Sequence, residues 1–150
     1  MITLTINGLD QFVVGRLSRE MTPSLAELYE VEQEEILFIA PQSMVFHNGV
    51  EQTSWNAVVR VDAPMKVRVL EDQVAQLILR MVKGPTINVQ VVFYYFSEDN
   101  FHELINNDYP RYIEDENLVN IANESYNDDL EEGEEDDQIF TGDIFKDFHG

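Results

Sequence analysis

Residues 57–96 constrain the fold more than any other stretch, because they have the pattern of a strand, a crossover helix and a second strand. Residues 57–61 have the β-branched density of a strand, and residues 65–83 then change to a helical period. The apolar stripe of that helix is Val67, Leu70, Val74, Leu77, Ile78 and Met81. Residues 87–96 follow as an apolar, aromatic-rich strand. Two strands joined by a packed helix are most simply parallel.

The first third of the chain has the same order of elements. Apolar and polar residues alternate from residue 2 to residue 7, as in a strand with one buried face. Asp10 is a favourable N-cap for a helix that reaches about Tyr29. Pro23 interrupts this helix, and we expect a kink or a restart there, since an interior proline costs about 3 kcal/mol. Residues 36–40 are continuously apolar, which is typical of a strand buried on both faces.

Two strand–helix–strand units, residues 2–46 and 57–96, predict an α+β fold with a four-stranded sheet and two helices on one face. Two architectures are built this way, the tautomerase-like fold and the ferredoxin-like sandwich, and the sandwich leaves the second sheet face exposed. Strands 36–40 and 91–96 are apolar on both faces, so the second face also needs cover. Other subunits of an oligomer provide such cover. We therefore favour the tautomerase-like fold, with the ferredoxin-like sandwich as the alternative.

The charge of the chain is concentrated in its last quarter. The formal net charge is −20 over 150 residues, and residues 114–150 hold 14 acidic residues against one basic residue. We expect a tautomerase-like domain over residues 1–113. Residues 114–150 are then an acidic tail, disordered in isolation, because so few apolar residues cannot offset the entropy of ordering it. Its apolar end, residues 139–148, is a candidate docking segment for a protein partner.

Composition excludes several classes of function. A chain this acidic, without a basic patch, repels phosphate backbones and acidic membrane surfaces, so neither nucleic acid nor membrane is an expected partner. The chain has no cysteine, and His47, His102 and His149 lack metal-ligand spacing, so we expect no metal and no cofactor. Without an apolar run of spanning length or a signal sequence, the plain interpretation is a soluble cytoplasmic protein.

Scattered matches identify a family. The run from residue 2 to residue 46, with Leu9-Asp10 at the start of the helix, Pro23, and Phe46 before an Asn-Gly turn, resembles a bacterial tautomerase-like family of unknown function. Residues 71–76, Glu-Asp-Gln-Val-Ala-Gln, resemble it too. The similarity extends to about residue 112. It implies a relationship to the superfamily of macrophage migration inhibitory factor and oxalocrotonate tautomerase, whose members assemble as trimers.

The resemblance places the chemistry at the N-terminus. In active members of the superfamily the base is the amine of a proline that is exposed when the initiator methionine is removed. The matching position here is Ile2, and a bulky second residue disfavours removal of methionine. The free amine is then that of Met1, which has an ordinary pKa of about 7.7–8.0 and acts as a general base only if its surroundings favour the neutral form.

Two cations are candidate binding residues. Arg60 lies in the third expected strand. It could bind a carboxylate in a pocket between subunits. In the simpler interpretation it belongs to an ion pair between subunits or to an exposed strand face. The resemblance implies an aromatic pair and an arginine after this strand. The stretch from residue 62 to residue 66 keeps only one cation, Lys66.

These observations lead to two hypotheses about function. The first is a trimeric tautomerase-fold protein that lacks proline-dependent tautomerase activity and acts by binding or assembly. The alternative is an isomerase of small keto-enol acids that uses the Met1 amine as its base. Phosphate-binding loops and nucleophile elbows are not present in the sequence, but tautomerase chemistry requires neither.

Overall fold

The computed structural model describes residues 1–117. Residues 1–111 form one compact unit, and the six described residues after it contain one short 3-10 helix, η4 (Asp115–Asn117). The predictions for most of the acidic tail, including the apolar segment 139–148 and His149, lie outside the described residues.

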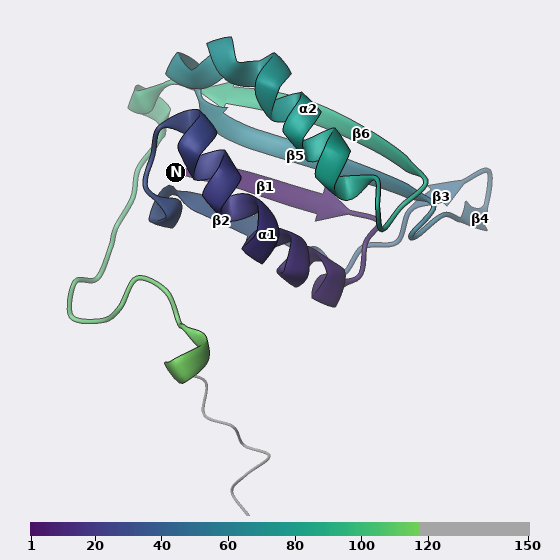
Figure 1. The fold of residues 1–150 in the computed structure, drawn as a ribbon, viewed down its shortest axis with the longest axis horizontal. Helices are drawn as coiled ribbons and strands as arrows, with labels where there is room; N and C mark the ends of the chain where they lie inside the picture. The colour runs from purple at the N-terminus through teal and green to yellow at the C-terminus, as the bar shows by residue number, and fades with distance from the viewer. Residues whose placement is uncertain (118–150) are drawn as a thin grey trace, which may run out of the picture. The chain divides into compact units, whose positions relative to one another are not determined.

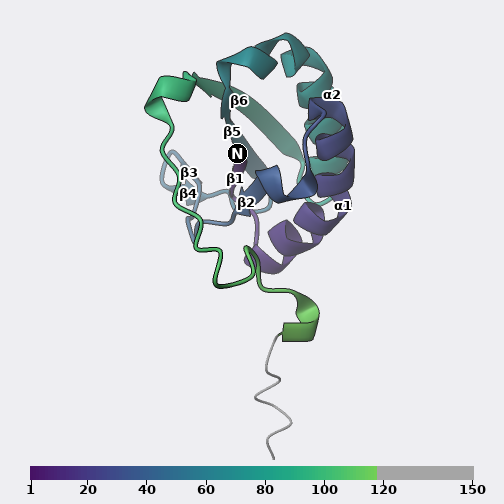
Figure 2. The same cartoon turned by 90° about the vertical axis from the view of Figure 1, so that its left-hand side faces the viewer.

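Two helices and a four-stranded sheet make up the compact unit (Figure 1). Figure 2 shows both helices on the same side of the sheet. The main elements are β1 (Ile2–Asn7), α1 (Gln11–Tyr29), β2 (Ile36–Ile39), β5 (Asn56–Pro64), α2 (Glu71–Val82) and β6 (Asn88–Phe96). The shorter elements are η1 (Gln33–Glu35), the hairpin strands β3 (Phe46–His47) and β4 (Val50–Glu51), η2 (Met65–Leu70) and η3 (Glu98–Asn100). This is the predicted α+β architecture.

The strand order is β2-β1-β5-β6. Within each strand–helix–strand unit the two strands are parallel, as predicted, with Ile2 opposite Ile36 in the first unit and Ala57 opposite Val89 in the second. The units meet through the antiparallel pair β1–β5. The β1 start, the β2 start and the ends of β5 and β6 therefore lie at one end of the sheet, where Figure 1 marks the N-terminus.

The core lies between the sheet and the helices. Alternate residues of β1 and β5 point into it, which is the period expected of strands with one buried face. The helices contribute their apolar stripes. The largest side chains with almost no exposure are Ile2, Leu4, Ile6, Val14, Leu17, Met21, Leu25, Val59, Val61, Val74, Ile78 and Val82.

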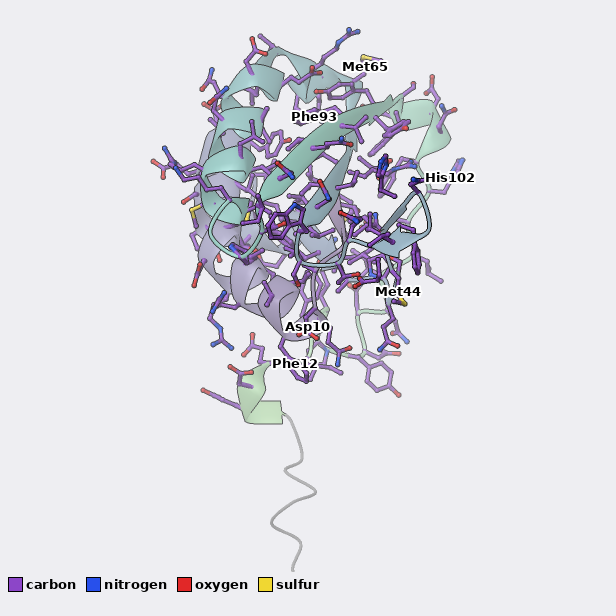
Figure 3. All side chains as sticks on the ribbon, turned by 90° about the vertical axis from the view of Figure 1, so that its right-hand side faces the viewer. Asp10, Phe12, Met44, Met65, Phe93 and His102 are labelled. Atoms are coloured by element: carbon purple, nitrogen blue, oxygen red, sulfur yellow. The ribbon has the colours of Figure 1, made fainter. Side chains whose placement is uncertain are left out.

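Helix α1 begins as the sequence predicts and continues where we expected a break. The Asp10 side chain accepts a hydrogen bond of 2.8 Å from the Phe12 amide at the start of the helix (Figure 3). The helix nevertheless runs through Pro23 as one element of 19 residues, so the expected restart is wrong. Pro23 is on the exposed side, and packing of residues such as Met21 and Leu25 on the buried side offsets the lost hydrogen bond.

The second helix is shorter than predicted. Residues 65–70 form the 3-10 helix η2 and only residues 71–82 are α-helical, while β5 extends to Pro64. The predicted stripe is kept in part, since Val74, Leu77 and Ile78 are buried. The apolar period alone does not distinguish a 3-10 turn from the first turn of an α-helix, because side chains three residues apart share a side in both.

The sheet face opposite the helices, here called the open face, carries apolar side chains. Leu37 and Ile39 of β2 and Val92 and Tyr94 of β6 lie on it and are between 37% and 49% exposed. These strands are therefore apolar on both faces, as predicted, and their outer side chains are uncovered in the single chain.

Candidate functional site

The amino terminus is held by a carboxylate at one end of the sheet. The Met1 ammonium donates a hydrogen bond of 2.6 Å to Glu35 Oε2, and the Met1 side chain is only 18% exposed. The pairing of β1 with β2 brings the two groups together, because Ile2 lies opposite Ile36 and the preceding residue of each strand is therefore adjacent. The amine is thus fixed by strand register.

Two further cations act on Glu35. The hydrogen bond from the amino terminus lowers the pKa of the Glu35 carboxyl, and the positive charges of Arg111 and Lys66 lower it further against the opposing effect of burial. Arg111 Nη1 lies 3.6 Å from Glu35 Oε1, and Arg111 Nη2 lies 3.5 Å from Glu103 Oε2. Glu35 therefore links the start of β1 to the segment that follows β6.

Lys66 has its own partner at the same end of the sheet. Its Nζ lies 2.7 Å from Glu98 Oε1, which joins η2 to η3. The pKa of Lys66 is raised and that of Glu98 is lowered, each mainly by this hydrogen bond. Both side chains are more than two thirds exposed, so solvent screens the pair.

Ile2, the position of the missing proline, belongs to the core. Its side chain is 2% exposed and its backbone lies in β1 between β2 and β5. The residue therefore has a packing role, and its peptide nitrogen is part of the strand rather than a free amine.

Arg60 lies on the open face, where two neighbours engage its guanidinium. Its Nε lies 2.8 Å from Asp62 Oδ2 and its Nη2 lies 2.7 Å from Asp62 Oδ1, a bidentate pair that raises the pKa of Arg60. The guanidinium carbon also lies 4.0 Å from the centre of the Tyr94 ring. A carboxylate ligand would have to compete with Asp62 for Arg60.

The four sequence-predicted residues do not form one site. Met1 and Lys66 meet around Glu35, at the end of the sheet where Ile2 enters the core. Arg60 lies four residues before the end of β5, about 13 Å from that end at the usual rise of a strand. Its guanidinium is engaged by Asp62 and Tyr94, so Arg60 does not belong to the group of charges around the amine.

A second polar contact lies at this end on the helix side of the sheet. The Tyr95 hydroxyl donates a hydrogen bond of 2.8 Å to Glu71 Oε2, which joins β6 to the first residue of α2. Burial and the Glu71 carboxylate raise the pKa of Tyr95 and of the buried Tyr29 well above the ordinary value. Both phenols therefore stay neutral, and Tyr95 acts as a hydrogen-bond donor.

Sequence reasoning missed the partners of each predicted residue. Asp62 was detectable in principle, because residues two apart on a strand share a face. No such signal marked Glu35, Glu98 or Arg111. The contacts Met1–Glu35, Lys66–Glu98 and Glu35–Arg111 each join residues at least 32 positions apart in the chain. Among the described residues, no three His, Cys, Asp or Glu side chains come together as a metal site would require. No helix among the described residues is long and apolar enough to span a membrane.

Three solved structures with similar folds show what the chain resembles. A protein of the family DUF1904 from Sebaldella termitidis aligns with a TM-score of 0.62 and 19% identity, over 69% of this chain and 95% of that one. A protein of unknown function from Vibrio cholerae aligns with a TM-score of 0.59 and 18% identity, over 68% of this chain and 83% of that one. A macrophage migration inhibitory factor-like protein from Entamoeba histolytica aligns with a TM-score of 0.53 and 10% identity, over 68% of this chain and 92% of that one. At these identities the likeness shows the fold, which is tautomerase-like.

No curated protein matches the chain in sequence. Residues 1–106 match the family described as "Domain of unknown function (DUF1904)". This range includes both strand–helix–strand units and, except for Arg111, all the charged residues around Met1. The chain belongs to DUF1904, a tautomerase-like family of unknown function.

Proposed function

We propose that this protein acts by binding and assembly through the open face of its sheet, and that it lacks proline-dependent tautomerase activity. The observation that carries the second part is the pairing of Met1 with Glu35. A general base needs a free electron pair, and an ammonium that donates its hydrogen bond to a carboxylate has none. Glu35 Oε2 accepts this hydrogen bond at 2.6 Å.

The buried position of Ile2 supports the same conclusion. Its side chain has almost no exposure, so the residue that replaces the proline is committed to the core. Removal of Met1 would leave a primary amine on a core residue and would also remove the ammonium that pairs with Glu35.

The open face supports the assembly. Apolar surface is exposed on this face by Leu37, Ile39, Val92 and Tyr94, whereas the other face of the sheet packs against the helices. Burial of this surface contributes about 25 cal/mol for each Å² removed from water. The closed trimer of the superfamily, which the resemblance implies, covers this face of each subunit with the other two. We therefore propose a homotrimer.

The Arg60–Asp62 pair makes this face suitable for burial. A lone guanidinium would carry a large desolvation penalty in a subunit interface, but here the charge is neutralised by a bidentate partner and stacked on Tyr94. Arg60 is then an interface residue, and a clamp for a substrate carboxylate is not required to explain it.

The experiment for assembly is light scattering on the full chain at micromolar concentration. We expect the mass of a trimer. Ile39→Lys, which introduces a charge on the open face, should shift the mass to that of smaller species. Val69→Lys is the matched control, because Val69 is 84% exposed in η2, outside the sheet. A wild-type monomer, or equal effects of both variants, would refute the assembly.

The alternative function is an isomerase of small keto-enol acids with the Met1 amine as base. Lys66 and Arg111 favour it, since both act on Glu35 beside the amine and cations suit an acidic substrate. Enol-to-keto conversion of an aryl pyruvate distinguishes the two. Turnover that disappears when the Met1 amine is acetylated would establish the isomerase, whereas no turnover by either form is expected from our proposal.

The remaining expectations concern organisation and location. We propose that the tautomerase-like domain ends near residue 113 and that residues 114–150 are an acidic tail offering its apolar end to a protein partner. The concentration of 14 acidic residues in this part of the chain supports it. The net charge of −20 also supports a protein that avoids nucleic acids and acidic membrane surfaces. We propose a cytoplasmic location, which a chain without cysteine is compatible with.

A further inference from the structure

A pocket without charged residues lies at the hairpin end of the sheet. Figure 1 shows the hairpin of β3 and β4 at the end of the sheet opposite to the N-terminus. Its volume is about 390 Å³, which is in the range of small-molecule sites. No Lys, Arg, Asp or Glu lines it, although a quarter of the chain is charged. By contrast, the groove between α1 and α2 is lined by Glu27, Glu30 and Arg80. Figure 3 views the molecule from the hairpin end.

An aromatic ring is presented to this pocket from a rigid turn. Trp55 lines the pocket and is 58% exposed. Its backbone is fixed on both sides, because its amide donates to the Gln52 carbonyl and its carbonyl accepts from the Asn88 amide, each at 2.9 Å. Gln52 is itself tied to the Val45 carbonyl at 2.6 Å. The backbone that carries the indole is therefore fixed, and less backbone conformational entropy is lost when a ligand packs on the ring.

A row of carboxamides forms the polar part of the wall. Asn88 Nδ2 donates to Asn56 Oδ1 and Asn56 Nδ2 donates to Gln52 Oε1, each at 3.1 Å. Gln52 Nε2 continues the row to the Val50 carbonyl at 3.2 Å. Each hydrogen bond fixes the orientation of the next side-chain amide. The row therefore presents the side-chain oxygen of Asn88, Oδ1, in a defined direction.

Three other groups in the lining are ready to bind a ligand. Within the described part of the chain, the Trp55 indole N–H, the His47 imidazole and the Gln90 carboxamide make no hydrogen bond. Together they offer both donors and acceptors around one aromatic face. A hydroxyl group, which both donates and accepts, is satisfied by such a set in several orientations.

We propose that this pocket binds a neutral sugar ring, with the apolar face of the sugar against Trp55 and its hydroxyls hydrogen-bonded by Gln90, Asn88 and His47. The proposal goes beyond the assembly proposed above and does not depend on it. The pocket is at the other end of the sheet from the amine, so the site is also separate from any chemistry at Met1.

Other ligand classes fit the lining less well. An anion meets no cation in the pocket and is repelled by a chain of net charge −20. A cation finds an aromatic face but no carboxylate in the lining. A purely apolar ligand would cover the amides without replacing their bonds to water, and leaving those groups unpaired disfavours binding.

Trp55 is the only tryptophan of the chain, so fluorescence reports on the pocket directly. We would titrate the full chain with D-glucose, D-galactose, D-mannose and N-acetyl-D-glucosamine up to tens of millimolar, and with choline and adenosine as competing classes. A saturable change in emission with at least one sugar is expected. The proposal fails if none of the four sugars changes the emission, or if only choline or adenosine does.

Two variants locate the site. Gln90→Ala should weaken sugar binding by about tenfold, which corresponds to one hydrogen bond to a hydroxyl. Gln76→Ala is the matched control, an exposed glutamine on α2 that should leave the affinity unchanged. Equal effects of the two variants would overturn the assignment. For Trp55→Ala, saturation-transfer NMR of the sugar should show loss of binding, with circular dichroism to verify folding.

Light scattering on the same samples keeps this inference distinct from the proposed assembly. Sugar binding by a monomeric chain would support the pocket and refute the trimer. A trimer without sugar binding would support the assembly and refute the sugar site.

Discussion

The Met1 amino nitrogen and Glu35 Oε2 are 2.6 Å apart although 34 residues separate them in the chain. By resemblance, the superfamily has its basic proline amine at the position of Ile2, one residue further along the chain. The N-terminus is in this way a structural element, joined through Glu35 to Arg111 and so to the segment after β6.

Removal of the Glu35 charge should lower stability, with a definite pH dependence. The folded-state pKa of Glu35 is below its ordinary value of 4.5, so its contribution is present above that pH and is lost as the pH falls through the folded-state pKa. The side chain is 37% exposed, and screening limits the loss for Glu35→Gln to about 1 kcal/mol at pH 7. Urea unfolding between pH 3 and pH 7 measures it.

The control for this prediction is Glu32→Gln, an exposed carboxylate just before η1 whose side chain makes no capping hydrogen bond. It should change the free energy of unfolding by less than about 0.5 kcal/mol. A Glu35→Gln effect that persists below the folded-state pKa would contradict the assignment to the ion pair.

Replacing two glycines by alanine should change the stability of the protein in opposite directions. Gly8 has a φ of +85°, and a Cβ there would collide with the Asn56 carbonyl oxygen, so Gly8→Ala should destabilise by more than about 1 kcal/mol. Gly15 lies in α1 with open space around a Cβ, so Gly15→Ala should stabilise by about 0.5–1 kcal/mol. Thermal melts of the two variants provide the comparison, and two changes of the same sign would be inconsistent with it.

A cavity in the centre of the core should be costly. Leu4 is in β1 with no exposure, and Leu4→Ala should lower the free energy of unfolding by about 2–5 kcal/mol. Val69→Ala truncates a side chain that is 84% exposed and should cost less than about 0.5 kcal/mol. Urea unfolding of both variants tests the prediction, and a loss below 1 kcal/mol for Leu4→Ala would argue against the register of β1.

Substitutions of Arg60 and Asp62 should have non-additive effects on subunit affinity if the open face is buried in an assembly. Asp62→Asn leaves the guanidinium without its counter-charge, so the subunit dissociation constant should rise at least about tenfold. The double variant Arg60→Met with Asp62→Leu should recover most of the affinity, because no unpaired charge remains. Sedimentation at several concentrations measures this. Additive effects would show that the pair stays exposed in solution.

The sequence predicted the scaffold well, because strand alternation and helical stripes are local signals. The alternating residues 2–7 became β1, and Asp10 became the N-cap of α1. The expected break at Pro23 was wrong, since packing of the buried stripe outweighs a local penalty on the exposed side. Of the hairpin formed by β3 and β4, the sequence indicated only the Asn-Gly turn. Its strands are two residues each, which is too short for a periodic signal.

The candidate sites were less predictable, because each depends on contacts across many residues. The sequence marked Met1, Ile2, Arg60 and Lys66 but gave no partner for any of them. The pocket at Trp55 had no signal at all, since its wall combines residues of the hairpin, β5 and β6.

The sequence by itself determined the order of the elements, the apolar residues on both faces of the two edge strands, and the presence of isoleucine at position 2. Only the tertiary structure decided that the Met1 amine meets Glu35 and that Arg60 faces Asp62 and Tyr94 on the open face. The physical reason is register. Periodicity fixes which side of a strand a residue occupies, but the neighbour it meets depends on how strands align, and that alignment is set by packing of the whole core.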